Sequence, residues 1–341
     1  MQSYKPKNLK KRKKILIIGG IGFIGHNLAI FLKKKNFLVY VLDSLSVNNL
    51  KNVNEKLPAE RKLYKSILDS RIKLLKNNKI KMIIQDARNN KKIFQHINKI
   101  NPDTVIHLAA VSHANKSNKD PHQTFDNSLR TLENTLDAIK DKKKHIIYLS
   151  SSMVYGNFDG REVKENEVCN PLGIYGNLKL AGEMIVKSYN QVFNIPYTII
   201  RPSALYGERC VSRRVSQIFV ENALRDKKIV INGDGEEKLD FTYILDLING
   251  IYLCCIKSNA KNQIFNLTFG NAKKINDLIK LIKKNFKNIK VEYQKRDKLT
   301  PVRGTLSIKK AKRYLNYKPK YSIMNGYVRY INWYKYHFKN H

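Results

Sequence analysis

The chain is poor in cysteine, with only Cys169, Cys210, Cys254 and Cys255 among 341 residues. None of them forms a C-x-x-C pair, and the adjacent pair is badly placed to chelate one metal ion. A disulfide framework and a structural zinc site are therefore both disfavoured, because each needs suitably spaced thiols. No cluster of His, Asp and Glu has the spacing of metal ligands either. We predict a metal-free protein of a reducing, cytoplasmic compartment.

Long uncharged apolar runs are missing except at residues 15–32, which carry no Lys, Arg, Asp or Glu. Basic residues precede this segment, so it imitates a signal peptide or a membrane anchor. Its four glycines, which fall within seven residues, would weaken an apolar helix. A buried strand, a tight turn and a helix explain the segment better. No other segment predicts a transmembrane span.

Acidic residues are scarce, because 27 Asp and Glu stand against 65 Lys and Arg, for a formal charge of +38. Such an excess suggests a nucleic-acid or membrane-surface role. Only 12 of the 50 lysines, however, lie within residues 101–250, the part that carries most of the motifs described below. This distribution favours a solvated basic surface without a specific nucleic-acid partner, and it leaves the binding role as an alternative.

Apolar runs typical of β-strands alternate with helical patterns over the first 200 residues. Strands separated by helices predict right-handed crossovers and hence an α/β fold, a Rossmann-type doubly wound parallel sheet. We expect a basic tail over 1–13, a first domain over 14–200 and a smaller α/β region over 201–341 that is interleaved with it. The expected strands are 15–18, 38–42, 81–84, 104–108, 145–149 and 197–200, and the expected helices are 23–35, 93–98, 121–140 and 175–193, with an inserted lysine-rich helix within 50–80.

The first expected strand and helix are joined by the glycine pattern Gly19-x-x-Gly22-x-x-Gly25. In this position the first glycine permits a tight turn, the second lets a diphosphate approach the backbone, and the third lets helix and strand pack closely. The amides at the start of the helix would bind the phosphates. Asp43 ends the second strand, where a carboxylate accepts hydrogen bonds from a ribose and repels a 2′-phosphate. The pattern predicts a dinucleotide site that prefers NAD to NADP.

Tyr175 and Lys179 are four residues apart in an expected helix, so both side chains lie on one face. An ammonium group near a phenol stabilises the phenolate. Such a tyrosine can take a proton from a hydroxyl group while hydride leaves the same carbon. Ser151 follows the fifth expected strand, at the edge where open α/β sheets bind ligands. Together the three residues predict hydride transfer at an alcohol or ketone carbon.

These motifs resemble those of extended short-chain dehydrogenases/reductases of the NAD-dependent epimerase/dehydratase family, most of all nucleotide-sugar 4-epimerases. The resemblance spans about residues 14–338 and includes Arg201-Pro202, Asp240-Phe-Thr-Tyr243 and Tyr330-Ile-Asn-Trp-Tyr334. It implies that NAD is held tightly by residues 14–200 and regenerated in each turnover, and that residues 201–341 mainly bind the substrate. The implied cofactor-binding residues are Gly19, Gly22, Phe23, Ile24, Gly25, Asp43, Asp86, Ala87, Leu108, Ala109, Ala110, Tyr175 and Lys179.

The same resemblance implies catalytic roles for Ser151, Tyr175 and Lys179, with Tyr175 deprotonating the 4-hydroxyl group of a sugar. In the dehydratases of the family an acidic pair follows the active-site hydroxyl residue, and here those positions hold Ser152 and Met153. Methionine cannot transfer a proton. Epimerisation is therefore favoured over 4,6-dehydration.

Two residues depart from the family pattern in the region that holds the diphosphate of the substrate. Ala204 stands where many relatives have asparagine, and Leu239 stands where many have arginine. A diphosphate usually requires an arginine fork, so other side chains should supply it. The candidate substrate-binding residues are Ser151, Ser152, Arg209, Arg213, Arg214 and Arg303.

Three functions stay open at this point. The first is an NAD-dependent nucleotide-sugar epimerase that inverts C4 of a UDP-sugar through a 4-keto intermediate, for surface polysaccharide synthesis. The second is a dehydratase or oxidoreductase of the same family. The third is a non-catalytic Rossmann protein whose basic surface binds nucleic acid or an anionic membrane. The family also implies a homodimer formed through the helices that match 121–140 and 175–193.

Overall fold

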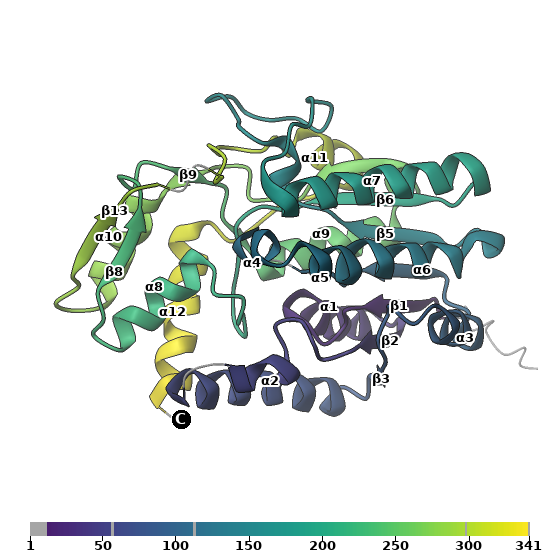
Figure 1. Cartoon of the computed structure of the whole chain (residues 1–341), viewed down its shortest axis with the longest axis horizontal. Coiled ribbons are helices and arrows are strands. Elements are labelled where there is room, and N and C mark those ends of the chain that lie inside the picture. The colour runs from purple at the N-terminus through teal and green to yellow at the C-terminus, as the bar shows by residue number, and fades with distance from the viewer. Residues whose placement is uncertain (1–11, 56–57, 112–113, 297–298, 340–341) are drawn as a thin grey trace, which may run out of the picture.

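A seven-stranded parallel sheet forms the centre of the computed structural model, which describes residues 12–55, 58–111, 114–296 and 299–339 (Figure 1). The strand order is β11-β6-β5-β4-β1-β2-β3, and every neighbouring pair is parallel. The expected tail falls almost wholly outside the described residues. The strands of this sheet are β1 (Lys14–Ile18), β2 (Leu38–Asp43), β3 (Lys81–Ile84), β4 (Thr104–His107), β5 (His145–Leu149), β6 (Tyr197–Arg201) and β11 (Gln263–Asn266).

Successive side chains of a strand point to opposite faces of the sheet, and in the buried strands both sets are apolar. Helices therefore cover both faces. In β1, Ile15 and Ile17 join one hydrophobic core, whereas Leu16 and Ile18 join the other. The helices on the first face are α1 (Phe23–Lys34) and α9 (Ile244–Ile256), and those on the second are α3 (Asn90–Ile100), α6 (Thr131–Asp137) and α7 (Gly173–Phe193).

The helical segment expected over 121–140 is not one regular helix. It consists of α5 (Pro121–Phe125), a π-helical turn η2 (Asp126–Arg130), α6 and a 3-10 turn η3 (Lys140–Lys142). A π-helical turn widens the helix locally, and such turns often occur at functional sites. Asn127 of this turn lines the first of the two cavities described below.

A second group of elements lies beside the sheet (Figure 1). In it, β8 pairs with β13, and the helices α8, α10 and α12 lie nearby. Two further two-stranded pairs, β7 with β10 and β9 with β12, belong to the same half of the chain. The bounds are β7 (Leu205–Tyr206), β8 (Ile229–Asn232), β9 (Lys238–Leu239), β10 (Thr242–Tyr243), β12 (Lys273–Lys274), β13 (Val291–Gln294), α8 (Val215–Leu224), α10 (Ile275–Asn285), α11 (Lys309–Leu315), α12 (Ile323–Lys339) and the 3-10 turn η5 (Ser258–Ala260).

The insertion between β2 and β3 contains a 3-10 turn, η1 (Leu50–Glu55), and the long helix α2 (Pro58–Asn77). The start of α2 lies beside the end of α12, at the bottom of Figure 1. The Ser66 hydroxyl is 3.2 Å from Nε2 of His337 in α12, and the Tyr64 hydroxyl donates to Glu221 of α8 over 2.8 Å. The inserted helix therefore joins the sheet to the second group of elements. One short helix, α4 (Ala114–Lys119), precedes α5.

Candidate active site

The turn after β1 has the geometry of a phosphate cradle. Gly19 has a φ of +81°, and a Cβ atom there would lie 2.8 Å from the backbone nitrogen of Ala109. A Cβ atom on Gly25 would lie 2.5 Å from the carbonyl oxygen of Gly19. Both positions therefore require glycine, and this lets the start of α1 approach the turn closely. The free amides at that start favour an anion.

Asp43 at the end of β2 stands beside this turn. Its Oδ2 atom accepts the Ile21 amide at 2.9 Å, and its Oδ1 atom accepts the Leu45 amide at 2.8 Å. Burial raises the pKa of this carboxyl, and the two amides oppose the rise. The amides fix the carboxylate in one orientation, and each oxygen retains acceptor capacity for a ribose hydroxyl group.

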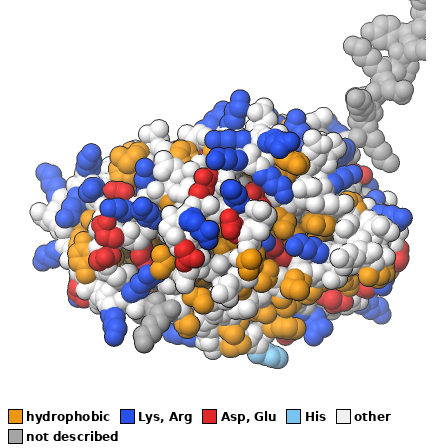
Figure 2. Space-filling view, turned by 90° about the horizontal axis from the view of Figure 1, so that it is seen from above, with side chains coloured by type: hydrophobic (Ala, Val, Ile, Leu, Met, Phe, Trp, Pro, Cys, Tyr) orange, Lys and Arg blue, Asp and Glu red, His pale blue; other side chains and the backbone are white. Residues whose placement is uncertain are grey.

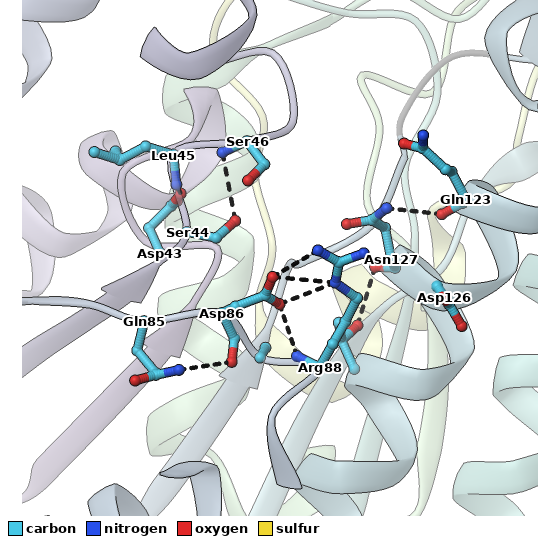
Figure 3. Close-up of polar contacts among 12 residues, drawn as sticks. Asp43, Ser44, Leu45, Ser46, Gln85, Asp86, Arg88, Gln123, Asp126 and Asn127 are labelled. Atoms are coloured by element: carbon cyan, nitrogen blue, oxygen red, sulfur yellow. Dashed lines mark hydrogen bonds and ion pairs between the residues drawn. The ribbon is translucent and has the colours of Figure 1, made fainter.

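A cavity runs along the carboxyl ends of β1 to β4, and we call it the first cavity. In Figure 3, Asp43, Asp86 and Asn127 approach the same space from β2, from the end of β3 and from η2. Asp86 is paired with Arg88 at 2.7 Å, and the Arg88 guanidinium lowers the pKa of that carboxyl. Eleven of the thirteen residues expected to bind the cofactor line this cavity: Gly19, Gly22, Phe23, Ile24, Gly25, Asp43, Asp86, Ala87, Leu108, Ala109 and Ala110.

A second cavity, of about 420 Å³, adjoins the first. Ile24, Leu108 and Ala110 are among the residues that line both. This volume is in the range of small-molecule sites. The remaining expected cofactor residues, Tyr175 and Lys179, line it together with Ser151. The expected nucleotide and catalytic residues thus lie in two connected spaces at the carboxyl edge of the sheet.

The three expected catalytic residues come from β5 and α7. Ser151 follows β5, and its Oγ atom accepts the Met153 amide at 3.2 Å, at the start of the 3-10 turn η4 (Ser152–Tyr155). Lys179 is buried and donates to the Leu149 carbonyl oxygen at 2.7 Å. Burial lowers the pKa of Lys179 to about 8, although Glu183 opposes the shift. A buried ammonium group beside the half-buried Tyr175 can stabilise a negative charge that develops in this cavity.

A buried ion pair lies beneath these residues. Arg201 at the end of β6 holds Glu183 of α7 through two bonds, Nε to Oε1 at 2.9 Å and Nη2 to Oε2 at 2.6 Å. The Ser150 hydroxyl also donates to Glu183, and the Arg201 guanidinium carbon is 4.7 Å from the centre of the Tyr155 ring. The pair ties α7 to the ends of β5 and β6, and so it fixes Ser151 relative to Tyr175 and Lys179.

One part of the second cavity is cationic. Arg214, Arg296 and Arg303 line it, and Glu237 is the only carboxylate among the described lining residues. Arg296 forms an ion pair with Glu237 and donates to the Thr300 carbonyl oxygen at 3.0 Å. Burial lowers the pKa of Arg303 to about 10, and its buried Nε atom has no hydrogen-bond partner. This part of the cavity suits a ligand with several negative charges.

The four arginines predicted to bind the substrate do not all lie in the same place in the structure. Arg214 and Arg303 line the second cavity, and so do the two serines, Ser151 and Ser152. Arg213 also lines it, but its guanidinium is paired with Glu60 of α2 at 2.5 Å. Arg209 lines neither cavity, and its guanidinium carbon is 5.7 Å from the ring of Trp333.

Sequence reasoning missed Arg296 and Arg71. Arg296 follows β13 and lines the second cavity, as does the uncharged Leu239. Arg71 belongs to the inserted helix α2 and lines the first cavity. Neither residue stands in a motif, so only the folded structure brings them to the site.

Comparison with known proteins identifies the family. Residues 15–268 match the NAD dependent epimerase/dehydratase family. The chain belongs to this family. A putative UDP-glucose 4-epimerase of Methanocaldococcus jannaschii is 31% identical over 328 residues, covering 94% of this chain and 98% of that protein. A dTDP-D-glucose 4,6-dehydratase of Dictyostelium discoideum is 32% identical over 274 residues, covering 75% of this chain and 58% of that protein.

Among solved structures, a UDP-glucuronic acid 4-epimerase from Bacillus cereus, in complex with UDP-glucuronic acid and NAD, matches with a TM-score of 0.85. It is 28% identical to this chain, and the match covers 95% of this chain and 99% of that one. The predicted family, the Rossmann-type α/β fold and the class of NAD-dependent epimerases of the extended short-chain type are therefore confirmed. The predicted cofactor, NAD, is confirmed as the cofactor of this family.

The described residues hold neither a cluster of metal ligands nor a membrane-spanning helix. No three His, Cys, Asp or Glu side chains among them are grouped so that they could hold a metal ion. A membrane-spanning helix would need a longer apolar stretch than any helix of the described chain provides.

Proposed function

We propose that this protein epimerises a UDP-sugar at C4 with NAD as a resident hydride carrier. The observation that carries the proposal is the position of Ser151, Tyr175 and Lys179 in a cavity that adjoins the glycine-turn cavity and is also lined by a group of arginines. The family membership and the bound ligands of the Bacillus cereus enzyme support it. The residues of the first cavity would hold NAD, and the bound cofactor would supply reversible hydride transfer at C4.

The side chains of this protein would then handle the proton and the orientation of the sugar. Tyr175 would take the proton of the 4-hydroxyl group and later give it back, acting as base and then as acid. Lys179, 6% exposed, would stabilise the phenolate by its charge. The Ser151 hydroxyl would bond the same sugar oxygen. The 4-keto sugar has to turn within the cavity, whose wall near Ser151 is formed by small side chains such as Ala110, Ser203 and Ala204.

A dehydratase of the same family is the second candidate, because of the Dictyostelium relative. The composition of the cavity argues against it. Elimination of water needs an acid and a base besides the tyrosine, yet Ser152 and Met153 follow Ser151. Glu237, the only carboxylate among the described residues that line this cavity, is bound to Arg296. Epimerisation needs no further proton carrier.

The cationic part of the second cavity would hold the diphosphate of the substrate. Arg303 offers an unpartnered buried Nε atom, and Arg296 lines the same cavity as the uncharged Leu239. We propose that Arg296, Arg303 and Arg214 together replace the missing arginine fork. This assignment supports a nucleotide-sugar rather than a free sugar as the substrate, because a free sugar has no charge that needs three cations.

We further propose that the enzyme is a cytoplasmic homodimer that serves surface polysaccharide synthesis. Met184 and Val192 of α7 and Phe125 of α5 are 61%, 68% and 45% exposed, which supports pairing through these helices. On the face in Figure 2, basic side chains are spread among acidic ones rather than gathered in one stripe. This pattern favours a solvated surface over a nucleic-acid interface. Sedimentation of the purified protein would test the dimer.

The experiment that tests the function is turnover of a panel of UDP-, dTDP-, GDP-, CDP- and ADP-sugars, with products separated by chromatography and identified by NMR. We expect two UDP-sugar epimers to equilibrate without net use of NAD. Tyr175→Phe should lower turnover by about 10²–10⁴-fold and leave NAD bound, as expected for loss of an acid–base group. Tyr189→Phe, on the same helix but outside both cavities, should change little.

Other outcomes of the panel would select another function. Release of a keto-sugar would indicate the dehydratase. No turnover of any sugar, with salt-sensitive polynucleotide binding, would favour the non-catalytic protein.

A further inference from the structure

One arginine of the inserted helix is buried in the first cavity with part of its hydrogen-bonding capacity unused. Arg71 is 1% exposed. Its Nε and Nη2 atoms donate to the carbonyl oxygen of Arg209, at 3.1 and 2.5 Å. Its Nη1 atom is buried without a hydrogen-bond partner. The side chain thus has one end fixed to the chain and one end available to a ligand.

The charge of Arg71 is also unbalanced. No carboxylate of the described residues forms an ion pair with it. Asp43 attracts it through space, but both oxygens of Asp43 already accept backbone amides. Burying a cation without a partner is costly, and an anion in the cavity would remove that cost. Arg71 lines the first cavity, where the amides of the glycine turn and of the start of α1 favour phosphate binding.

The partner of Arg71 connects this cavity with the second one. Arg209 precedes Ser212, which lines the first cavity, and Arg214, which lines both. Residues 207–214 therefore run from one cavity to the other, and we call them the substrate loop. The inserted helix holds this loop at a second point, through the ion pair of Arg213 with Glu60. The loop thus rests on α2 at two points, Arg209 and Arg213.

We propose that Arg71 binds the diphosphate of the nucleotide cofactor through Nη1 while it holds Arg209, so that cofactor binding orders the substrate loop. The proposal rests on the proposed function only for the identity of the cofactor as NAD. The cofactor would restrain Arg71, and Arg71 would restrain the backbone that carries Arg214. A site assembled in this way accepts the sugar nucleotide best after the cofactor is in place.

The first test measures NADH and NADPH binding to the purified full-length protein by fluorescence, without any sugar. Arg71→Met should weaken both dinucleotides by a similar factor, roughly 10- to 100-fold, the effect of losing one charge-assisted hydrogen bond. Lys73→Met removes the same charge from an exposed position of the same helix and should leave both affinities unchanged. Arg71→Lys keeps the charge without the fork and should fall between them, which covers the case of poor folding of Arg71→Met.

The second test follows amide hydrogen exchange in residues 205–217 with and without NADH. NADH should slow exchange there in the wild type and in Lys73→Met, and it should have no effect in the Arg71 variants at saturating NADH. Unchanged NADH affinity in Arg71→Met and Arg71→Lys would overturn the proposal, and so would loss of NADPH affinity alone, which would assign Arg71 to a 2′-phosphate. Loop protection that persists in both Arg71 variants would also overturn it. Since no sugar is used, these results do not depend on whether epimerisation is found.

Discussion

Replacing Glu183 by glutamine is expected to destabilise the protein strongly, because it breaks the ion pair beneath the active site. Glu183 and Arg201 are 0% and 2% exposed and are joined by two hydrogen bonds. The substitution keeps the shape of the side chain and removes its charge. The Arg201 cation then stays buried against an amide group, whose nitrogen is a donor where the carboxylate offered a second acceptor.

The magnitude follows from the burial of both partners. Removing one partner of a buried ion pair costs about 3–5 kcal/mol, because the remaining charge has neither water nor a counter-charge. The unfolding entropy is about 2.1 cal/mol/K per residue, so over 341 residues this loss lowers Tm by about 4–7 °C. The Ser150 hydroxyl loses a carboxylate acceptor as well, and we expect a lower kcat because Ser151 is the next residue.

The assay is urea and thermal unfolding followed by circular dichroism. Asp69→Asn is the matched control, since it breaks the exposed pair of Lys65 and Asp69 and should cost less than about 1 kcal/mol. The double variant Glu183→Leu with Arg201→Met removes both charges and should be more stable than either single variant. A Glu183→Gln protein within about 1 kcal/mol of wild type, or a double variant no better than the singles, would refute the reasoning.

Three further outcomes are expected. Asp43→Ala should weaken NADH about 10- to 100-fold and NADPH less, since the carboxylate would accept from the ribose and repel a 2′-phosphate; an unchanged ratio of the two dissociation constants would contradict this role. Burial lowers the pKa of Lys179 to about 8, so its ammonium form is half populated at that pH, predominates below it and is lost above it. The pH profile of kcat/KM should therefore fall about tenfold per pH unit above 8, and a flat alkaline limb would argue against a need for the charge. Arg296→Met and Arg303→Met should each raise KM for the UDP-sugar about 10- to 100-fold with kcat nearly retained, while the exposed Lys238→Met should not; equal KM values would remove these arginines from the diphosphate site.

The parts of the fold that the sequence predicts are those with strong local signals. The expected strands over 81–84 and 145–149 agree residue for residue with β3 and β5, and the other four differ by one residue at an end. The glycine turn is equally local, because Gly19 and Gly25 are required by contacts within the turn and with its neighbouring strand. The positions of Asp43, Ser151 and Tyr175 are predictable for the same reason. Each stands at a fixed distance along the sequence from such an element.

The parts that the sequence does not predict depend on contacts between distant segments. Arg71 lies in an insertion, and only the packing of α2 brings it to Arg209 and the first cavity. Arg296 reaches the cavity because β13 pairs with β8 and because Glu237 binds its guanidinium. Arg213 lines the second cavity, as the sequence predicts for a substrate-binding residue, yet its guanidinium is paired with Glu60 of the insertion. A residue type at a promising position does not say what else its side chain binds.

The strand β11 has a consequence for how the protein is made. It pairs with β6 along Thr198, Ile199 and Ile200, which are all fully buried, and its own Phe265 is buried as well. The sheet that carries the cofactor cavity is therefore completed by a segment translated more than sixty residues after its sixth strand. A nascent chain ending near residue 200 exposes an apolar edge that can pair with other chains. A fragment cut there would aggregate rather than fold as a separate nucleotide-binding unit.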